Sequence, residues 1–182
     1  MSTASNLSFV DPAEVLRGLP IQLGQKVVDF GCGAGFFSFE FAKRVGPEGQ
    51  VIALDILPSA LEAVASRAKT LGLQNLETRR ANLEREKGSR LLAESMDWVV
   101  IKDMLFQNEN KQVILSEAFQ VLQLGGHAFV MEWRPEATTF GPERGLRVSQ
   151  DVLKQLLEEV GFSIVKELSV GAFHYAFLVT KK

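Results

Sequence analysis

Hydrophobic residues follow two alternating patterns along the chain. Short continuous apolar runs are typical of strands buried on both faces of a parallel sheet. Such runs occur at residues 27–30, 50–54, 97–101 and 128–132. Between them, apolar residues recur every three or four positions, which predicts helices with one buried face. These helices are expected at residues 36–45, 58–71, 109–122 and 149–160. The alternation predicts an α/β fold around a mostly parallel sheet.

The end of the chain departs from this alternation. Two further strands, at 162–168 and 172–180, are separated only by the short turn 169–171. Parallel neighbours need a long crossover connection, so this last pair must be antiparallel. A seventh strand at 75–81 is rich in charged residues, which suits the edge of a sheet.

The turn after the first predicted strand carries the strongest chemical signal. Glycine occupies alternate positions there, at Gly31, Gly33 and Gly35. A glycine turn between a strand and a helix lets a ligand approach the backbone closely. The second strand is followed by Asp55, whose carboxylate can accept hydrogen bonds from ribose hydroxyls. The pattern predicts a cofactor that contains a nucleoside.

Spacing and charge discriminate between such cofactors. A dinucleotide-binding turn needs a small residue at the position where this chain has Phe36. Asp29 precedes the turn, where its carboxylate would repel a pyrophosphate but attract a sulfonium or ammonium group. S-adenosyl-L-methionine is a nucleoside with a cationic tail and no phosphate, so it fits both observations.

These residues resemble a known family. The sequence Asp-Phe-Gly-Cys-Gly-Ala-Gly at 29–35 is similar to the first cofactor motif of class I S-adenosylmethionine-dependent methyltransferases, and the turn at 123–126 is similar to the family's Lys-Pro-Gly-Gly. The resemblance covers roughly residues 10–182 and is strongest to small stand-alone enzymes near the ubiquinone/menaquinone-biosynthesis C-methyltransferases. It implies a Rossmann-like, doubly wound, seven-stranded sheet with an antiparallel strand near the C-terminus, and S-adenosyl-L-methionine as cofactor.

The predicted cofactor site lies beyond the carboxyl ends of the strands, where doubly wound folds bind ligands. Its expected residues are Asp29, Gly31, Cys32, Gly33, Gly35, Asp55, Ile56, Asn82, Leu83 and Lys102. Asn82 can accept a hydrogen bond from the adenine amino group, although asparagine is also a common loop residue. Cys32, the single cysteine, is expected to pack rather than react, because no His or Lys neighbours it.

Three residues at the same edge are candidates for catalysis. Asp103 follows the fourth strand, Glu132 ends the fifth, and His174 lies in the final hairpin. Each could serve as a general base in a partly dry site, and the alternative is a solvated acid or a structural histidine. No zinc-ligand spacing occurs, so no metal site is predicted. The Asp/Asn-Pro-Pro-aromatic signature, which in this family marks methylation of adenine or glutamine amino groups, does not follow the fourth strand, which argues against a nucleic-acid amine as acceptor.

Length and composition fit one methyltransferase domain over residues 1–182. Residues 1–20 are expected to form an N-terminal helix or lid, and the Pro- and Gly-containing stretch 133–148 is expected to be a substrate loop. A net charge of −2 gives no electrostatic footprint for nucleic acid. The sequence shows neither a signal peptide nor an apolar run long enough for a membrane span.

The expected activity is methyl transfer to an oxygen, nitrogen or activated carbon of a small molecule in the cytoplasm, which the single cysteine fits. Two alternatives stay open on sequence alone. One is a methyltransferase that acts on a protein or on rRNA, and the other is a regulatory domain that binds the cofactor without catalysis.

Overall fold

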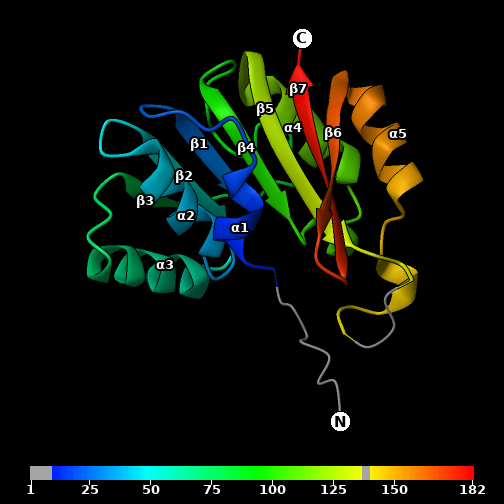
Figure 1. Cartoon of the computed structure of the whole chain (residues 1–182), viewed down its shortest axis with the longest axis horizontal. Helices are drawn as coiled ribbons and strands as arrows, with labels where there is room; N and C mark the ends of the chain where they lie inside the picture. The colour runs from blue at the N-terminus through cyan, green and yellow to red at the C-terminus, as the bar shows by residue number, and fades with distance from the viewer. Residues whose placement is uncertain (1–9, 137–139) are drawn as a thin grey trace.

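The computed structural model describes residues 10–136 and 140–182. They contain one seven-stranded sheet with the order β3-β2-β1-β4-β5-β7-β6 (Figure 1). Its strands are β1 Lys26–Phe30, β2 Gln50–Asp55, β3 Leu76–Arg80, β4 Met96–Lys102, β5 Leu122–Trp133, β6 Phe162–Val170 and β7 His174–Lys181. β7 runs antiparallel to both of its neighbours, β5 and β6, whereas the remaining pairs are parallel. The predicted mixed sheet and its antiparallel hairpin are confirmed.

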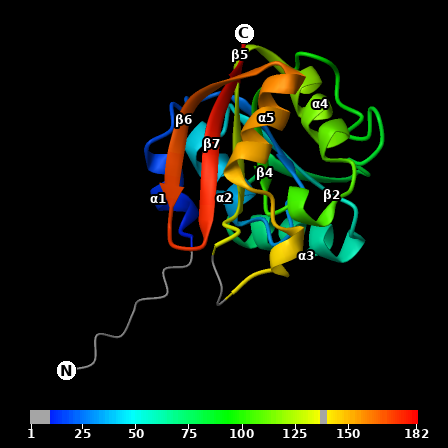
Figure 2. The ribbon, with the colours of Figure 1, turned by 90° about the vertical axis from the view of Figure 1, so that its right-hand side faces the viewer.

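Helices cover both faces of this sheet. They are α1 Pro12–Arg17, α2 Phe36–Val45, α3 Pro58–Thr70, α4 Lys111–Val121 and α5 Gln150–Val160, with 3-10 turns η1 Leu105–Gln107 and η2 Arg144–Leu146. Side chains of α1 and α2 pack with Trp98 and Val100 on one face, while those of α4 and α5 pack with Val99 and Ile101 on the other. Figure 2 shows α1 and α5 on opposite sides of the hairpin strands.

Local sequence explains where most elements begin and end. The Asp11 side chain accepts a hydrogen bond from the Ala13 N–H at 2.9 Å and begins α1. Ser149 caps α5 in the same way, through Val152 N–H at 3.3 Å, and Gly161 ends that helix in the left-handed region at φ 110°.

The predicted start of the fifth strand at residue 128 is wrong. β5 begins at Leu122, which pairs with Met96 of β4 before the register shifts ahead of Trp98. Gly125, at φ 78°, lies within this stretch. Gln123 and the two glycines at 125–126 resemble a turn in sequence, but here they belong to the irregular first part of a long strand.

Two expected functional segments are only partly described. Residues 1–9 of the predicted N-terminal segment and residues 137–139 of the predicted substrate loop lie outside the described residues. Arg44 of α2 anchors the described part of the N-terminal segment, because it donates to Ala13 O at 2.7 Å and Leu16 O at 3.3 Å. Over residues 10–136 and 140–182, no helix combines the length and apolar character that crossing a bilayer requires.

Candidate functional site

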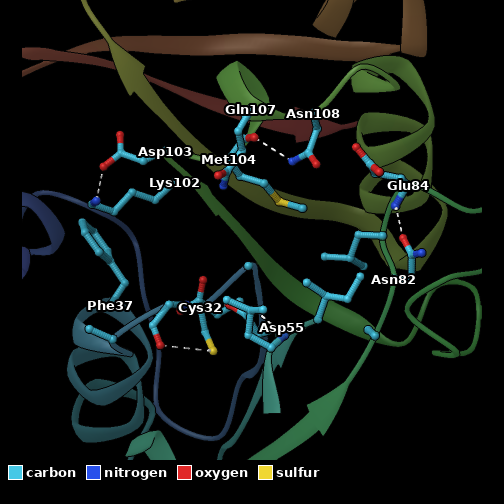
Figure 3. Close-up of a pocket in the computed structure, with 18 of the residues that line it drawn as sticks. Cys32, Phe37, Asp55, Asn82, Glu84, Lys102, Asp103, Met104, Gln107 and Asn108 are labelled. Atoms are coloured by element: carbon cyan, nitrogen blue, oxygen red, sulfur yellow. Dashed lines mark hydrogen bonds and ion pairs between the residues drawn. The ribbon is translucent and has the colours of Figure 1, made fainter. Parts of the chain in front are cut away.

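A cavity of about 600 Å³ lies beyond the carboxyl ends of β1, β2, β3 and β4 (Figure 3). Of the predicted cofactor-binding residues, those that line it are Asp29, Gly31, Cys32, Gly33, Asp55, Ile56, Asn82, Leu83 and Lys102. Asp103 lines the same cavity. The fold therefore brings residues from four strand ends to one space, as the doubly wound topology predicts.

Two glycines of the first turn serve different purposes. Gly33 leaves room for a ligand, whereas Gly35 permits close packing of the helices. A β-carbon built on Gly33 would have no heavy atom of the described residues within 4 Å, so this position opens toward the cavity. A β-carbon on Gly35 would approach Val64 Cγ2 to 2.8 Å and Phe39 Cζ to 3.0 Å. Gly35 is not among the described residues that line the cavity. It allows α2 and α3 to pack closely behind the turn.

Asp55 joins the first turn to the end of β2. Its Oδ2 accepts a hydrogen bond from Gly33 N–H at 3.0 Å, and its Oδ1 accepts one from Leu57 N–H at 3.0 Å. Each carboxylate oxygen keeps a second lone pair that can accept from a ribose hydroxyl. Asp55 therefore both shapes the glycine turn and offers acceptors beside it.

Asp29 is a buried carboxylate that lines the cavity. It is 3% exposed, and its Oδ2 accepts a 2.5 Å hydrogen bond from the Ser38 hydroxyl. Burial raises the pKa of Asp29 to about 6, although the bond from Ser38 and the charge of Lys102 oppose the shift. A cationic ligand group beside it would favour the ionised form, so the residue suits a sulfonium or ammonium tail.

The end of the cavity beside Asn82 is lined by polar side chains, which are Asn82, Glu84, Gln107 and Asn108. Asn82 Oδ1 accepts from the Glu84 N–H at 3.1 Å, which orders the loop after β3. Gln107 and Asn108 face this loop across the cavity in Figure 3. Asn108 is held by a 2.7 Å bond from its Nδ2 to Met104 O. Sequence reasoning missed Gln107 and Asn108, because the short η1 turn has no hydrophobic period that marks it.

Asp103 occupies the cavity end away from Asn82 (Figure 3). Its Oδ2 pairs with Lys102 Nζ, and its Oδ1 lies 3.1 Å from His174 Nε2. Burial raises the pKa of Asp103, but the His174 and Lys102 contacts outweigh burial and hold it below its usual range. Asp103 is therefore ionised at neutral pH, with Lys102 paired to one oxygen and His174 close to the other.

The other two catalytic candidates lie behind Asp103. His174 is 7% exposed and packs on Trp133, with ring centroids 4.1 Å apart. Glu132 is 0% exposed, and its Oε1 accepts from Met104 N–H at 2.9 Å and Leu105 N–H at 2.6 Å. Neither His174 nor Glu132 is among the described residues that line the cavity.

Cys32 lines the cavity together with the carboxylates of Asp29 and Asp55. In the described part of the chain, no three His, Cys, Asp or Glu side chains are arranged to hold a metal ion. Burial, with the charges of Asp29 and Asp55, raises the pKa of Cys32, so its thiol is neutral. The expectation of a packing cysteine agrees with this environment.

A family model described as a methyltransferase domain matches residues 21–161. The chain belongs to this family. It is 31% identical over 123 residues to a demethylmenaquinone methyltransferase of Lactococcus lactis, covering 66% of this chain and 46% of that protein. It is 28% identical over 156 residues to an arsenite methyltransferase of Halobacterium salinarum, covering 79% of this chain and 38% of that protein.

Solved structures support the fold of this methyltransferase domain. A SAM dependent methyltransferase from Aquifex aeolicus matches with a TM-score of 0.88 and 23% identity, over 98% of this chain and 94% of that one. The chain spans less than half the length of the two relatives above, at 46% and 38%. Family and fold together assign S-adenosyl-L-methionine as the cofactor. The open space at Gly33 and the carboxylates of Asp29 and Asp55 fit that molecule.

Proposed function

We propose that this chain transfers a methyl group from S-adenosyl-L-methionine to an oxygen, nitrogen or activated carbon of a small-molecule acceptor. One observation carries the proposal. An ionised carboxylate, Asp103, lines the same cavity as Asp29 and Asp55, at the end away from Asn82. An acceptor bound at that end would meet both the cofactor's cationic tail and a hydrogen-bond acceptor from the protein.

The roles of the side chains follow from their positions. When bound, the cofactor supplies an activated methyl group on its sulfonium. Asp55 and the glycine turn would hold the nucleoside, and Asp29 would neutralise the cationic tail. Asp103 would accept a hydrogen bond or proton from the acceptor. Because an in-line displacement needs little else, most of the rate enhancement would come from proximity and orientation.

The names of the relatives support a small acceptor. Demethylmenaquinone and arsenite, which appear in those names, are both small molecules. An organic acceptor suits this chain better than arsenite, because arsenic prefers thiolate ligands. The sequence has one cysteine, and burial raises the pKa of that Cys32 thiol. The acceptor side of a single domain would be completed by the N-terminal segment 1–20 and the loop 133–148.

The test is a labelling experiment in cell extract. The purified chain receives S-adenosyl-L-methionine with an isotope-labelled methyl group, and small molecules and macromolecules are analysed separately. Label in a small-molecule product that is lost with Asp103→Asn supports the proposal. Label in protein or rRNA would show that the acceptor class is wrong. Tight binding of S-adenosyl-L-homocysteine without any labelled product would instead indicate a non-catalytic regulatory domain.

A further inference from the structure

Glu132 and His174 approach Asp103 from opposite faces of the sheet. In the β5–β7 pair, Glu132 lies opposite Tyr175 and Trp133 lies opposite His174. Successive side chains of a strand point to opposite faces. Glu132 therefore shares a face with Tyr175, whereas His174 and Trp133 share the other. The Asp103 turn lies between them, at the end of β4.

The contacts made by Glu132 are to the backbone of this turn. Its Oε1 accepts from Met104 N–H at 2.9 Å and Leu105 N–H at 2.6 Å, the two residues directly after Asp103. Asp103 itself has φ 49°, in the left-handed region that residues with a β-carbon rarely adopt. A strained residue persists where its surroundings over-determine it. The two bonds to Glu132 supply that constraint immediately after the strained residue.

We infer that Glu132 is a positioning residue of the acceptor side, which holds the turn after β4 so that the Asp103 carboxylate faces the cavity. The inference rests on the proposed function, because that function gives Asp103 its role toward the acceptor. Glu132 is 0% exposed and lies outside the described lining of the cavity, so it cannot touch an acceptor there. Glu132 would therefore affect the reaction only through the position of Asp103.

The ionisation of Glu132 suits a hydrogen-bonding role. Burial, together with the charge of Asp103, raises its pKa to about 7 against the opposing bonds from Leu105 and Met104. Asp103 on the β4 side and Tyr175 on the β7 side are the titratable groups that face it. Its Oε2 has no hydrogen-bond partner among the described residues, so a proton resides there readily. Oε1 still accepts both N–H bonds when Oε2 is protonated.

Two substitutions separate positioning from proton transfer. Glu132→Gln keeps an acceptor oxygen at the same reach but cannot take up a proton. Glu132→Asp keeps the carboxylate but is one methylene shorter, so it loses the reach to Met104 and Leu105. If Glu132 acts by positioning the turn, Glu132→Gln should retain turnover and Glu132→Asp should lose it. A proton-accepting role predicts the opposite.

The chain also offers a matched control. Glu117 of α4 is another buried carboxylate, 5% exposed, that accepts from Lys87 N–H at 3.1 Å and Ser89 N–H at 3.2 Å. None of these three residues is among the described residues that line the cavity. Glu117→Asp therefore weakens a similar carboxylate-to-backbone anchor elsewhere in the fold. It reports the effect of lost stability without a change at Asp103.

The experiment measures three quantities on the full chain. Amide hydrogen exchange at Met104 and Leu105 reports the turn, and calorimetry with S-adenosyl-L-homocysteine reports the cofactor site. Turnover on the acceptor identified by methyl labelling reports the reaction. Glu132→Asp should lose about tenfold or more of the amide protection and about 10- to 100-fold of turnover, with cofactor affinity within about threefold. Glu132→Gln should keep all three, and Glu117→Asp should keep turnover and the two amides.

Unchanged protection at Met104 and Leu105 in Glu132→Asp overturns the inference, whatever the acceptor. Lost protection with full turnover also overturns it, as does a glutamine variant that is as impaired as the aspartate variant. If no product is labelled at all, the proposed function fails, and the amide exchange still decides whether Glu132 holds the turn.

Discussion

The cofactor side and the acceptor side of the cavity are built in different ways. The proposed cofactor side is built around a short contiguous segment, residues 29–35, with Asp55 from the end of β2 and Asn82 from the loop after β3. The proposed acceptor side is assembled from three strand ends, because Asp103 directly follows β4, Glu132 lies near the end of β5 and His174 begins β7. The cofactor side is formed mainly by backbone and open space, whereas the acceptor side is formed mainly by side chains that contact one another or the backbone. Substitutions should therefore affect binding on one side and turnover on the other.

The largest effect is expected at Asp103. Asp103→Asn removes the charge but retains a residue type that tolerates the left-handed region, where Asp103 has φ 49°. If the carboxylate accepts the acceptor's proton, turnover should fall by about 10²- to 10⁴-fold with cofactor affinity nearly unchanged. Steady-state kinetics and calorimetry test this together. Full turnover in the variant would mean that orientation alone supports transfer.

Gly33 and Gly35 test the cofactor side from within one turn. Gly33→Val places a side chain in the open space above the turn, and we expect binding of S-adenosyl-L-homocysteine to weaken by about 100-fold or more. Unfolding should stay cooperative, although φ 51° makes the variant less stable. Gly35→Val would instead clash with Val64 and Phe39. Calorimetry and thermal unfolding separate the two, and a Gly33→Val chain that does not fold would assign Gly33 a structural role.

Asp55 should show an intermediate effect on binding. Asp55→Ala removes charged acceptors for ribose hydroxyls, worth roughly 1.5–3 kcal/mol, or about 10- to 150-fold in affinity. It also releases the N–H groups of Gly33 and Leu57, which Asp55 holds at 3.0 Å. Asp55→Asn serves as the control, because its amide oxygen can still accept from one of them. Unchanged affinity in the alanine variant would remove Asp55 from the cofactor site.

The pH dependence of stability should have opposite signs on the two sides. Burial raises the pKa of Asp29 to about 6, so between its ordinary 3.8 and 6 the folded chain binds a proton that the unfolded chain releases. Its contribution to the free energy of unfolding therefore falls as pH rises through this window, by roughly 2–3 kcal/mol. The pKa of Asp103 is lowered, so its contribution is present above the ordinary value and lost on acidification below it.

Denaturant unfolding at a series of pH values measures both contributions. Compared with the parent chain, Asp29→Asn should flatten the curve between about pH 4 and 6. Asp103→Asn should flatten it at lower pH and leave the Asp29 window intact. Identical curves for the parent chain and Asp29→Asn would contradict the buried, destabilising carboxylate.

Much of the fold was predictable because it depends on local pattern. The apolar runs located the four central strands and the helical periods located the longer helices, and the short turn before β7 required an antiparallel hairpin. The start of β5 was missed because the glycines at 123–126 have the composition of a turn. Their pairing with β4 depends on strands that lie side by side only in the folded chain.

The sequence by itself determined the family, the sheet and the composition of the cofactor turn, since each is written in contiguous residues or fixed spacings. Only the tertiary structure decided how the proposed acceptor side is organised. Asp103 lines the cavity, while His174 contacts its carboxylate and Glu132 bonds to the backbone that follows it. These three residues lie far apart in the chain, and strand order and side-chain alternation assign each its face. Periodicity along one segment carries no information about such cross-strand contacts, because they depend on which strands become neighbours.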